Sequence, residues 1–363
     1  MRLVVAVGNR PNVVKISPLI PEFERAGISA DLAFTGPREL ERREGIESGL
    51  TFYGVAIPAP KWYLDIGVDA DSTTTGRAMT AFERLFSTER PDAVMVVGDS
   101  DSTLGAAVAA AKVGLPVVHL EAGMRCGNLS YPDEINRVLI SRISAMHLTP
   151  TERALENLED EGIEPERIHF VGETIAEAVL RNLDDVAHYD AAAEQGLTQR
   201  GYVLACFHRG ENLGDAMRLQ AIFDGCSRSL LPVLLPDADD LRGAVATFGV
   251  QVPSTVRVTD PVGYRTMLAL ERDAAVIVTD SAGVQVEACM ACVPCLTVRD
   301  CTEVISTVEA GANRLVPADS EAIARAVGDA MRRKRSWVAP KRWDRAVSDR
   351  VVRALKRGVI PLT

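Results

Sequence analysis

The chain has 363 residues, of which 47% are hydrophobic and 25% are charged, a composition typical of an ordinary globular protein. This length favours two domains over one. The formal net charge of −10 argues against a surface that binds nucleic acid, although it leaves room for a local basic pocket for phosphate. No apolar run is long enough to span a bilayer, so we expect neither a nucleic-acid nor a membrane partner.

The N-terminus and the cysteines predict a cytoplasmic protein. The opening run MRLVVAVGNR is too short for the core of a signal peptide and predicts a first strand instead. The seven cysteines are odd in number and lack a secretory context. We therefore expect reduced thiols in a cytoplasmic compartment.

The first half of the chain alternates short apolar runs with helical segments. A helix carrying Lys15 follows the first run, the charged segment 38–49 predicts another helix, and a helix of small residues spans 104–111. Such alternation is typical of a doubly wound parallel sheet, whose strands are near-continuous apolar runs. The predicted strands are residues 3–7, 30–35, 94–97, 116–120, 146–149 and 168–171.

Two polar residues in this half stand just after predicted strands. Arg10 lies in a turn before a helix, where helix N–H groups favour an anion, and its guanidinium can bind phosphate oxygens in pairs. Asp99 follows another strand, at the edge where open α/β sheets bind ligands. The simpler interpretations, a surface arginine and a helix-capping aspartate, stay open on these residues alone.

The segment 118–137, VHLEAGMRCGNLSYPDEINR, holds three further acids. Glu121 ends a predicted strand, and Asp133 and Glu134 stand where Pro132 predicts a helix start. Because ligands bind beyond the carboxyl ends of parallel strands, these acids can reach two sides of one ligand. The alternative is that Glu121 is solvated and Asp133 only helps the helix to begin, and the segment alone leaves both interpretations open.

The second half of the chain repeats the alternation of strands and helices. We therefore expect an α/β protein of two Rossmann-like, doubly wound domains, residues 1–178 and 179–342, with the final helix in 343–363 packing back on the first. A polar, alanine-rich helical region up to about residue 200 marks the boundary. The predicted strands of this half are residues 202–207, 233–235, 256–258, 274–278 and 295–298.

Two motifs of the second half suit a nucleoside diphosphate. His208 and Arg209 together end the first strand of this half, which suits a diphosphate. The run 278–287 predicts a strand, a turn of small residues at Ser281, and a helix whose first N–H groups hold a phosphate. Glu287 then lies one turn inside, where it can accept both hydroxyls of a ribose. A structural histidine and a capped helix with an exposed glutamate are the alternatives.

Three cysteines, Cys289, Cys292 and Cys295, have a spacing that resembles an iron–sulfur motif. We reject a metal site, because the first two are predicted on the helix after the turn and the third begins the next strand. Thiols on packed elements, and not on one loop, are typical of buried free cysteine.

These motifs, taken in order, resemble those of the UDP-N-acetylglucosamine 2-epimerase family, of the non-hydrolysing bacterial type. The resemblance covers nearly the whole chain, and each motif is weak alone. The matching segments are GNRPNVVK (8–15), TGRAM (75–79), VVGDSDST (96–103), HLEAGMRCGNLSYPDEINR (119–137), HRGEN (208–212), DPVGY (260–264), TDSAGVQVEA (279–288) and VEAGANRLV (308–316).

The resemblance implies a fold of the glycosyltransferase-B type, a UDP-sugar bound in a cleft between the domains, a homodimer, and no cofactor. It implies that Asp99, Glu121 and Asp133 are the acids of the reaction, with His208 beside the diphosphate. The residues implied to bind UDP are Arg10, Lys15, His208, Arg209, Tyr264, Ser281, Ala282, Gly283, Glu287 and Arg314.

The implied reaction inverts C2 of UDP-N-acetylglucosamine to give UDP-N-acetylmannosamine. The hydrogen on C2 is not acidic, so the implied route expels UDP from C1 as the C2 proton leaves, which gives 2-acetamidoglucal. Reprotonation on the other face and return of UDP complete the inversion. Acids on two sides of the sugar handle the protons, and Arg10 and His208 stabilise the diphosphate. The sequence does not assign a carboxylate to each face.

Four positions depart from the family pattern. Asp133 replaces the usual glutamate and is one methylene shorter, and an aspartate near this place is similar to the hydrolysing relatives. Thr302–Ser306 lacks the arginine of the usual T-E-R-P-E. Thr35–Arg38 and Leu235–Pro236 replace T-G-Q-H and His-Pro, which line an activating UDP-N-acetylglucosamine pocket in many bacterial members. We therefore predict weak or absent activation by substrate.

Other functions remain open on the sequence. A hydrolysing epimerase would release N-acetylmannosamine and UDP, and a related epimerase would act on a modified UDP-sugar. A glycosyltransferase of the same fold is disfavoured, because the acids at the strand ends match the epimerases. A nucleotide-sugar binder without catalysis is kept open by Asp133 and by the missing arginine.

Overall fold

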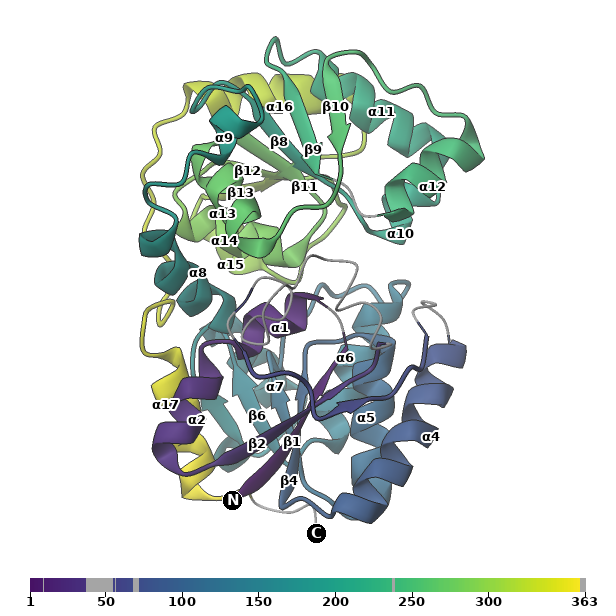
Figure 1. The fold of residues 1–363 in the computed structure, drawn as a ribbon, viewed down its shortest axis with the longest axis vertical. Helices are drawn as coiled ribbons and strands as arrows, with labels where there is room; N and C mark the ends of the chain where they lie inside the picture. Colours follow the sequence, from purple (N-terminus) through teal and green to yellow (C-terminus); the bar gives the residue numbers. More distant parts are fainter. Residues whose placement is uncertain (9, 37–54, 56, 68–71, 237–238, 360–363) are drawn as a thin grey trace. The chain divides into compact units, whose positions relative to one another are not determined.

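The computed structural model describes the chain except for residues 9, 37–54, 56, 68–71, 237–238 and 360–363 (Figure 1). The helix expected at 38–49 therefore lies outside the described residues. The chain divides into two compact units, the first formed by Met1–Ala178 with Lys341–Thr363 and the second by Val179–Pro340.

Unit 1 contains a parallel sheet of seven strands in the order β3-β2-β1-β4-β5-β6-β7. All six strands predicted in this half are present, whereas β3 and α4 were not predicted. The elements are β1 Arg2–Val7, α1 Arg10–Ile16, α2 Leu19–Ala26, β2 Ser29–Phe34, β3 Trp62–Tyr63, α4 Ser72–Glu89, β4 Ala93–Val97, α5 Asp101–Lys112, β5 Val117–Leu120, α6 Pro132–Ile143, β6 Met146–Thr149, α7 Glu152–Asp160, β7 Ile168–Phe170, α8 Thr174–Asp185, which continues into unit 2, and α17 Val347–Arg357.

Unit 2 contains a parallel sheet of six strands in the order β10-β9-β8-β11-β12-β13. Of these six strands, only β13 was not predicted. With one parallel sheet in each unit, the prediction of two Rossmann-like, doubly wound domains is confirmed. The elements are α9 Ala191–Glu194, β8 Val203–Cys206, α10 Gly210–Leu213, α11 Ala216–Ser227, β9 Val233–Pro236, α12 Asp239–Phe248, β10 Val256–Thr259, α13 Tyr264–Asp273, β11 Val276–Thr279, α14 Ala282–Met290, β12 Cys295–Thr297, α15 Ile305–Glu309, β13 Asn313–Leu315 and α16 Ser320–Arg332.

The core of unit 1 depends on close packing of α4 against α5. A Cβ added to Gly105 would lie 2.6 Å from the Cβ of Ala78 and 2.7 Å from the carbonyl oxygen of Thr75. The small residues of α5 are therefore needed for this approach. Phe82 and Phe86 of α4 stack with ring centroids 5.3 Å apart and complete this layer against one face of the sheet.

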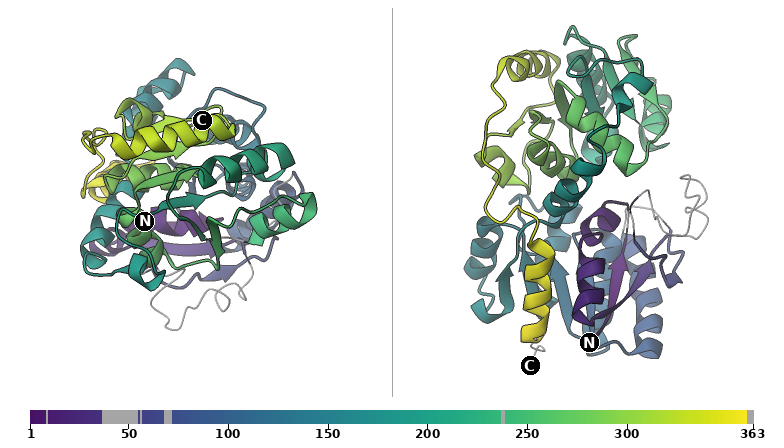
Figure 2. Two further views of the ribbon diagram at one scale, coloured as in Figure 1. Left: turned by 90° about the horizontal axis from the view of Figure 1, so that it is seen from above. Right: turned by 60° about the vertical axis from the view of Figure 1, so that its left-hand side comes forward.

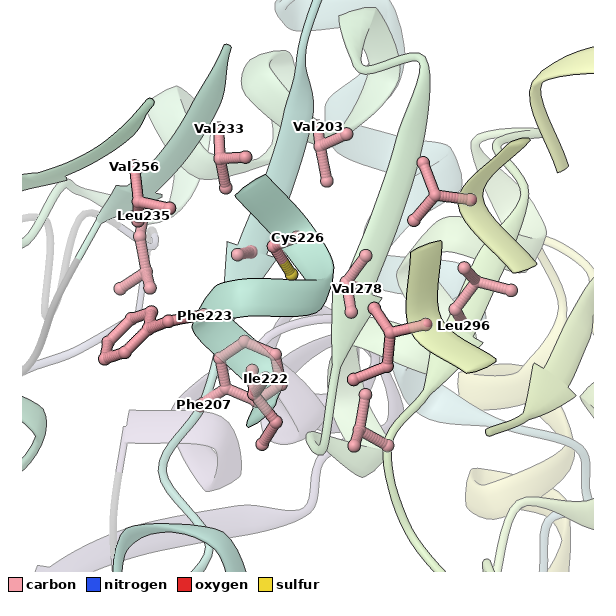
Figure 3. Close-up of a cluster of buried hydrophobic side chains, with 14 of the residues drawn as sticks. Val203, Phe207, Ile222, Phe223, Cys226, Val233, Leu235, Val256, Val278 and Leu296 are labelled. Carbon is pink, nitrogen blue, oxygen red and sulfur yellow. The ribbon is translucent and has the colours of Figure 1, made fainter. Parts of the chain in front are cut away.

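The core of unit 2 lies between its sheet and the helices α11 and α16 (Figure 3). Phe223 and Cys226 of α11 face the strand residues Val203, Val233 and Val278. These strands are apolar on consecutive positions because a parallel sheet with helices on both faces leaves neither face in water.

The last helix, α17, belongs to unit 1 and lies beside α2 (Figures 1 and 2). The backbone N–H and the hydroxyl of Ser348 donate to the buried Glu177 carboxylate at 2.7 and 2.8 Å. The indole N–H of Trp343 donates to the carbonyl of Pro150 at 3.2 Å. Within the described part of the chain, no helix has both the length and the apolar character that crossing a membrane requires.

Gly172, between β7 and α8, is the glycine whose replacement tests this packing. Its φ is +99°, and a Cβ there would lie 2.1 Å from the carbonyl oxygen of Arg342. We expect Gly172→Ala to lower the free energy of unfolding by roughly 3 kcal/mol or more. The alanine would have a strained φ, and the backbone at Arg342 would also have to move to make room for its Cβ. Urea denaturation measures the change.

Gly162→Ala is the matched control. Its φ is +79°, but a Cβ there would meet nothing within 4 Å. The expected loss is only the conformational penalty of about 1–2 kcal/mol. Equal losses for the two variants would contradict the packing described for the segment that leads into α17.

Candidate functional site

The site in unit 1 lies where the strand order reverses, between β1 and β4. Open α/β sheets bind ligands at this point, beyond the carboxyl ends of the strands. Gly98 directly follows β4 and has φ +70°, and a Cβ there would lie 3.2 Å from Lys15 Nζ and 3.4 Å from Glu121 Oε2. The glycine thus leaves room for these two charged groups. Nε2 of the buried His119 lies 2.9 Å from the Gly98 carbonyl oxygen, and burial lowers the pKa of His119 to about 3.

Lys15 and Glu121 form a buried ion pair, with Nζ 2.5 Å from Oε2. Burial alone would lower the pKa of Lys15, but the charges of Glu121 and Asp99 outweigh it and the net shift is upward. Burial raises the pKa of Glu121, and the ammonium opposes that rise. Glu121 also has φ +66°, a conformation in which residues other than glycine are strained and which is found at functional sites.

Glu173 is a third member of this cluster, and the sequence analysis did not name it. It follows β7, is 1% exposed, and accepts a hydrogen bond from the Ile175 N–H at 3.1 Å. Burial, followed by the charge of Glu121, raises the pKa of Glu173 to about 8. The carboxyl groups of Glu173 and Glu121 are hydrogen-bonded to each other. The cluster therefore consists of the Lys15 ammonium and these two acids.

Arg137 joins Asp99 to the start of α6. Its guanidinium, 3% exposed, lies 2.6 Å from Asp99 Oδ2 and 2.7 Å from Glu134 Oε2. Glu134 also accepts hydrogen bonds from the N–H groups of Cys126 and Gly127, and these bonds help to lower its pKa although burial alone would raise it. Asp133 lies beside Glu134 in the first turn of α6 and is half-buried. Asp99 and Glu134 are therefore held by one buried cation.

The site in unit 2 lies at the equivalent reversal of strand order, between β8 and β11. Asp280 is fully buried at the end of β11 and accepts hydrogen bonds from the N–H groups of His208 and Arg209 at 3.0 and 3.2 Å. It also accepts one from Asn212 Nδ2 at 2.9 Å. The His208 ring, 43% exposed, has Nδ1 3.5 Å from Asp280 Oδ1. Asp280 thus fixes the loop from which His208 projects.

A network of alternating charges lies beside this loop. Arg299 is the largest of the fully buried side chains and pairs with Glu211 at 2.8 Å and with Glu303 at 2.7 Å. Glu303 also pairs with Arg209 at 2.8 Å. The segment after β8 and the segment after β12 are therefore tied together by ion pairs, of which the buried Arg299–Glu303 pair is the least screened by water.

The turn predicted to hold a phosphate is present at the start of α14. Ser281 caps this helix, with its hydroxyl accepting from the Val284 N–H at 3.4 Å, and Ala282 and Gly283 form the first turn. The first N–H groups of a helix have no partner within it and attract an anion. Glu287 lies one turn on and is buried, not exposed, beside Glu271 and Tyr264. Burial, then the Glu287 charge, raises the pKa of both neighbours.

The structure thus brings the predicted residues into one group in each unit. Lys15, Asp99 and Glu121 lie together in unit 1, and Asp133 lies in the first turn of α6 next to Glu134, which shares Arg137 with Asp99. His208 and Arg209 share Asp280 in unit 2. Arg314 pairs with Asp329 of α16 at 3.5 Å on an exposed face, not with the turn at Ser281. The Arg10 side chain lies outside the described residues.

The residues that sequence reasoning missed are mostly buried partners of those it found. Glu173 and Asp280 each follow a parallel strand, so the rule that singled out Asp99 and Glu121 also applied to them. Cys292 was assigned wrongly to a helix: α14 ends at Met290, and Cys292 lies in the following turn with φ +56°.

Comparisons with known proteins place this geometry among epimerases. The family model described as UDP-N-acetylglucosamine 2-epimerase matches residues 42–356. A UDP-N-acetylglucosamine 2-epimerase of Methanocaldococcus jannaschii is 35% identical over 99% of this chain and 100% of its own. A UDP-2,3-diacetamido-2,3-dideoxy-D-glucuronate 2-epimerase of Pseudomonas aeruginosa is also 35% identical, over 89% of this chain and 90% of its own.

Solved structures agree. The M. jannaschii UDP-GlcNAc 2-epimerase in complex with UDP-GlcNAc and UDP has a TM-score of 0.90 at 34% identity, covering 99% of this chain and 100% of that one. The spinosyn rhamnosyltransferase SpnG, at 14% identity, shares the fold alone, with a TM-score of 0.54 over 99% of this chain and 96% of that one. These matches support the glycosyltransferase-B class of fold.

Replacing Arg299 tests the charge network. Arg299→Met leaves the Glu211 and Glu303 carboxylates without this buried cation, so we expect the free energy of unfolding of unit 2 to fall by roughly 3–5 kcal/mol. Denaturant midpoints followed by circular dichroism measure the loss. Arg325→Met, which breaks an exposed pair with Glu321, is the control and should change stability by no more than about 0.5 kcal/mol. A network that contributes nothing would make the two variants alike.

Proposed function

This chain belongs to the UDP-N-acetylglucosamine 2-epimerase family, and from that premise we propose that it is a non-hydrolysing epimerase that inverts C2 of UDP-N-acetylglucosamine. The observation that carries the proposal is the buried Lys15–Glu121 pair with Asp99 beside it, at the reversal of strand order in unit 1. A carboxylate kept ionised in a largely buried place is suited to removing a weakly acidic proton.

The proposed reaction is an elimination followed by an addition. The C2–H bond breaks and its electron pair forms the C1=C2 double bond, while the C1–O bond breaks and UDP leaves with the electron pair of the C1–O bond. A proton then returns to C2 on the other face, and a diphosphate oxygen of UDP adds to C1. Glu121, Asp99 and Asp133 are the candidate acids and bases for the two faces.

Unit 2 supplies the groups for the nucleotide in this proposal. The N–H groups at Ala282 and Gly283 and the His208 ring would bind the diphosphate, whose negative charge grows as the C1–O bond breaks. Glu287 would accept the ribose hydroxyls, and Arg209, Tyr264 and Arg314 stay proposed as further contacts. Lys15 and Arg10 stay proposed as cations for the diphosphate, and the ion pair with Glu121 gives Lys15 a second role.

A second candidate substrate is a modified UDP-sugar. It is favoured by the P. aeruginosa relative, which is named for a diacetamido glucuronate and has the same 35% identity as the M. jannaschii enzyme, over a smaller share of this chain. Both sugars carry an acetamido group at C2, so the same elimination applies to either. The groups at C3 and C5 of the sugar distinguish them.

Proton NMR in heavy water tests the proposal. Incubation with UDP-N-acetylglucosamine should give UDP-N-acetylmannosamine with deuterium at C2 and UDP still attached. Free N-acetylmannosamine with free UDP would identify the hydrolysing reaction instead. Exchange that occurs only with the diacetamido glucuronate would assign the second substrate, and binding without exchange of either would contradict catalysis.

Glu121→Gln should separate catalysis from binding. The amide keeps the shape of the side chain but cannot accept a proton, so we expect kcat to fall by roughly 10²–10⁴-fold. UDP affinity, measured by isothermal titration calorimetry, should change far less than kcat, because the proposed UDP contacts of unit 2 are untouched and only Lys15 loses its partner. Retention of kcat would remove Glu121 from the reaction.

We also propose that substrate activation is weak or absent. Leu235 stands where many bacterial members have the histidine of an activating pocket, and it is buried in the unit 2 core. Thr35 donates from its hydroxyl to the Gly8 carbonyl at 2.9 Å, whereas Pro37 and Arg38 lie outside the described residues. Rates from UDP-N-acetylmannosamine should be hyperbolic. Sigmoidal curves that traces of UDP-N-acetylglucosamine rescue would contradict this.

A further inference from the structure

Glu173 has no role in the reaction as proposed above, yet it lies in the same buried cluster. In the sheet order β5-β6-β7 the ends of the parallel strands β5 and β7 lie on the same edge, and Glu173 and Glu121, which follow them, are hydrogen-bonded. Only 1% of Glu173 is exposed, and one of its oxygens accepts from the Ile175 N–H. A second carboxyl beside a proposed catalytic acid requires an explanation, because an isolated buried charge is costly.

The charges in this cluster decide which acid keeps a proton. Among the residues that the structure describes, Lys15 is the cation that faces the two carboxyls, and its Nζ is 2.5 Å from Glu121 Oε2. One ammonium balances one carboxylate, so a second ionised acid in the same buried place would be uncompensated. Since Lys15 holds Glu121 ionised, the proton stays on Glu173, where it is available for a hydrogen bond to Glu121.

We propose that Glu173 is a positioning residue for the epimerisation: a protonated carboxyl that donates a hydrogen bond to Glu121 and, with Lys15, orients the carboxylate that faces the sugar. This inference rests on the proposed function. Glu121 is thereby held by an ammonium and a carboxylic acid, and its backbone has the strained conformation with φ +66°. A carboxylate fixed in this way needs no reorganisation when the proton moves.

The titration of Glu173 depends on the charged groups around it. Glu173 is faced by Lys15 from α1, by Glu121 after β5 and by the Ile175 N–H at the start of α8, and Asp99 after β4 adds its charge to the same cluster. Since burial raises the pKa of Glu173 to about 8, its proton is lost above that pH. Glu121 then faces a second anion in place of a donor, and the proposed activity falls.

The kinetic test compares Glu173→Gln with wild type. Glutamine keeps a donor for Glu121 but does not titrate, so kcat at pH 7 should stay within about tenfold while the alkaline limb of the kcat–pH profile moves up by about one pH unit or more. Glu173→Ala, without a donor, should lose roughly 10²-fold in kcat with a smaller change in KM. Identical alkaline limbs for wild type and Glu173→Gln would overturn the proposal.

Glu177→Gln is the matched control. Glu177 lies on the same helix α8 and is fully buried, but it accepts its hydrogen bonds from Ser348 of α17. This variant should lose stability and keep the alkaline limb of wild type. A limb that moves in both variants would mean that burial of a glutamate on α8, and not the bond to Glu121, sets the profile.

A second readout does not depend on catalysis. Because the folded pKa of Glu173 is raised, the folded state binds its proton more tightly than the unfolded chain does, and wild-type stability falls as pH rises towards 8. The excess Tm of Glu173→Gln over wild type should therefore grow from about pH 5 to pH 8 and then level off. Parallel Tm curves would show that Glu173 carries no proton, whereas a growing difference with no epimerase activity would reject only the proposed function.

Discussion

The buried ion pair between Lys15 and Glu121 is the interaction on which the site in unit 1 depends. Removing two charges from water is costly, and attraction offsets that cost only when the geometry is close and the remaining hydrogen-bonding groups are satisfied. Here the two atoms are 2.5 Å apart, Gly98 leaves room for both, and Glu121 has a strained backbone conformation with φ +66°.

Unit 2 uses the same design with a different partner. Its buried strand-end acid, Asp280, accepts hydrogen bonds from two backbone N–H groups of the loop after β8 and from the side-chain amide of Asn212 in α10, and not from an ammonium. Asp280 follows β11, which borders the reversal of strand order in unit 2. Glu121 follows β5, which is one strand away from the reversal in unit 1. In each unit a second buried glutamate contacts a proposed site residue: Glu173 contacts Glu121, and Glu271 contacts Glu287. Burial raises the pKa of both.

Much of the fold was predictable from sequence because parallel strands covered on both faces are continuous apolar runs. The exceptions have physical reasons: β3 has only two residues, and β13 has three and carries Arg314 in its middle. Asp99, Glu121, His208 and Ser281 were found because each follows a strand.

The partners of these residues were not predictable from sequence, because they are distant in the chain and become partners only through the sheet order. Arg137 lies 38 residues from Asp99, and Arg299 lies 88 residues from Glu211. Val304, which stands where the family has an arginine, is a buried apolar residue. Glu303, beside it, is already paired with Arg209 and Arg299. The Arg10 side chain and the segment at 37–54 lie outside what the structure describes.

The central claim is that the cluster of Lys15, Glu121 and Glu173 holds a single carboxyl proton at neutral pH, and that it resides on Glu173. Carbon-13 NMR of glutamate carboxyls in the labelled, ligand-free protein tests this most directly, with Glu173→Gln and Glu121→Gln used to assign the signals. The account predicts that the Glu173 carboxyl stays protonated at pH 7 and titrates near pH 8, while the Glu121 carboxyl is ionised. An ionised Glu173 at pH 7, or a proton on Glu121 in its place, would contradict it.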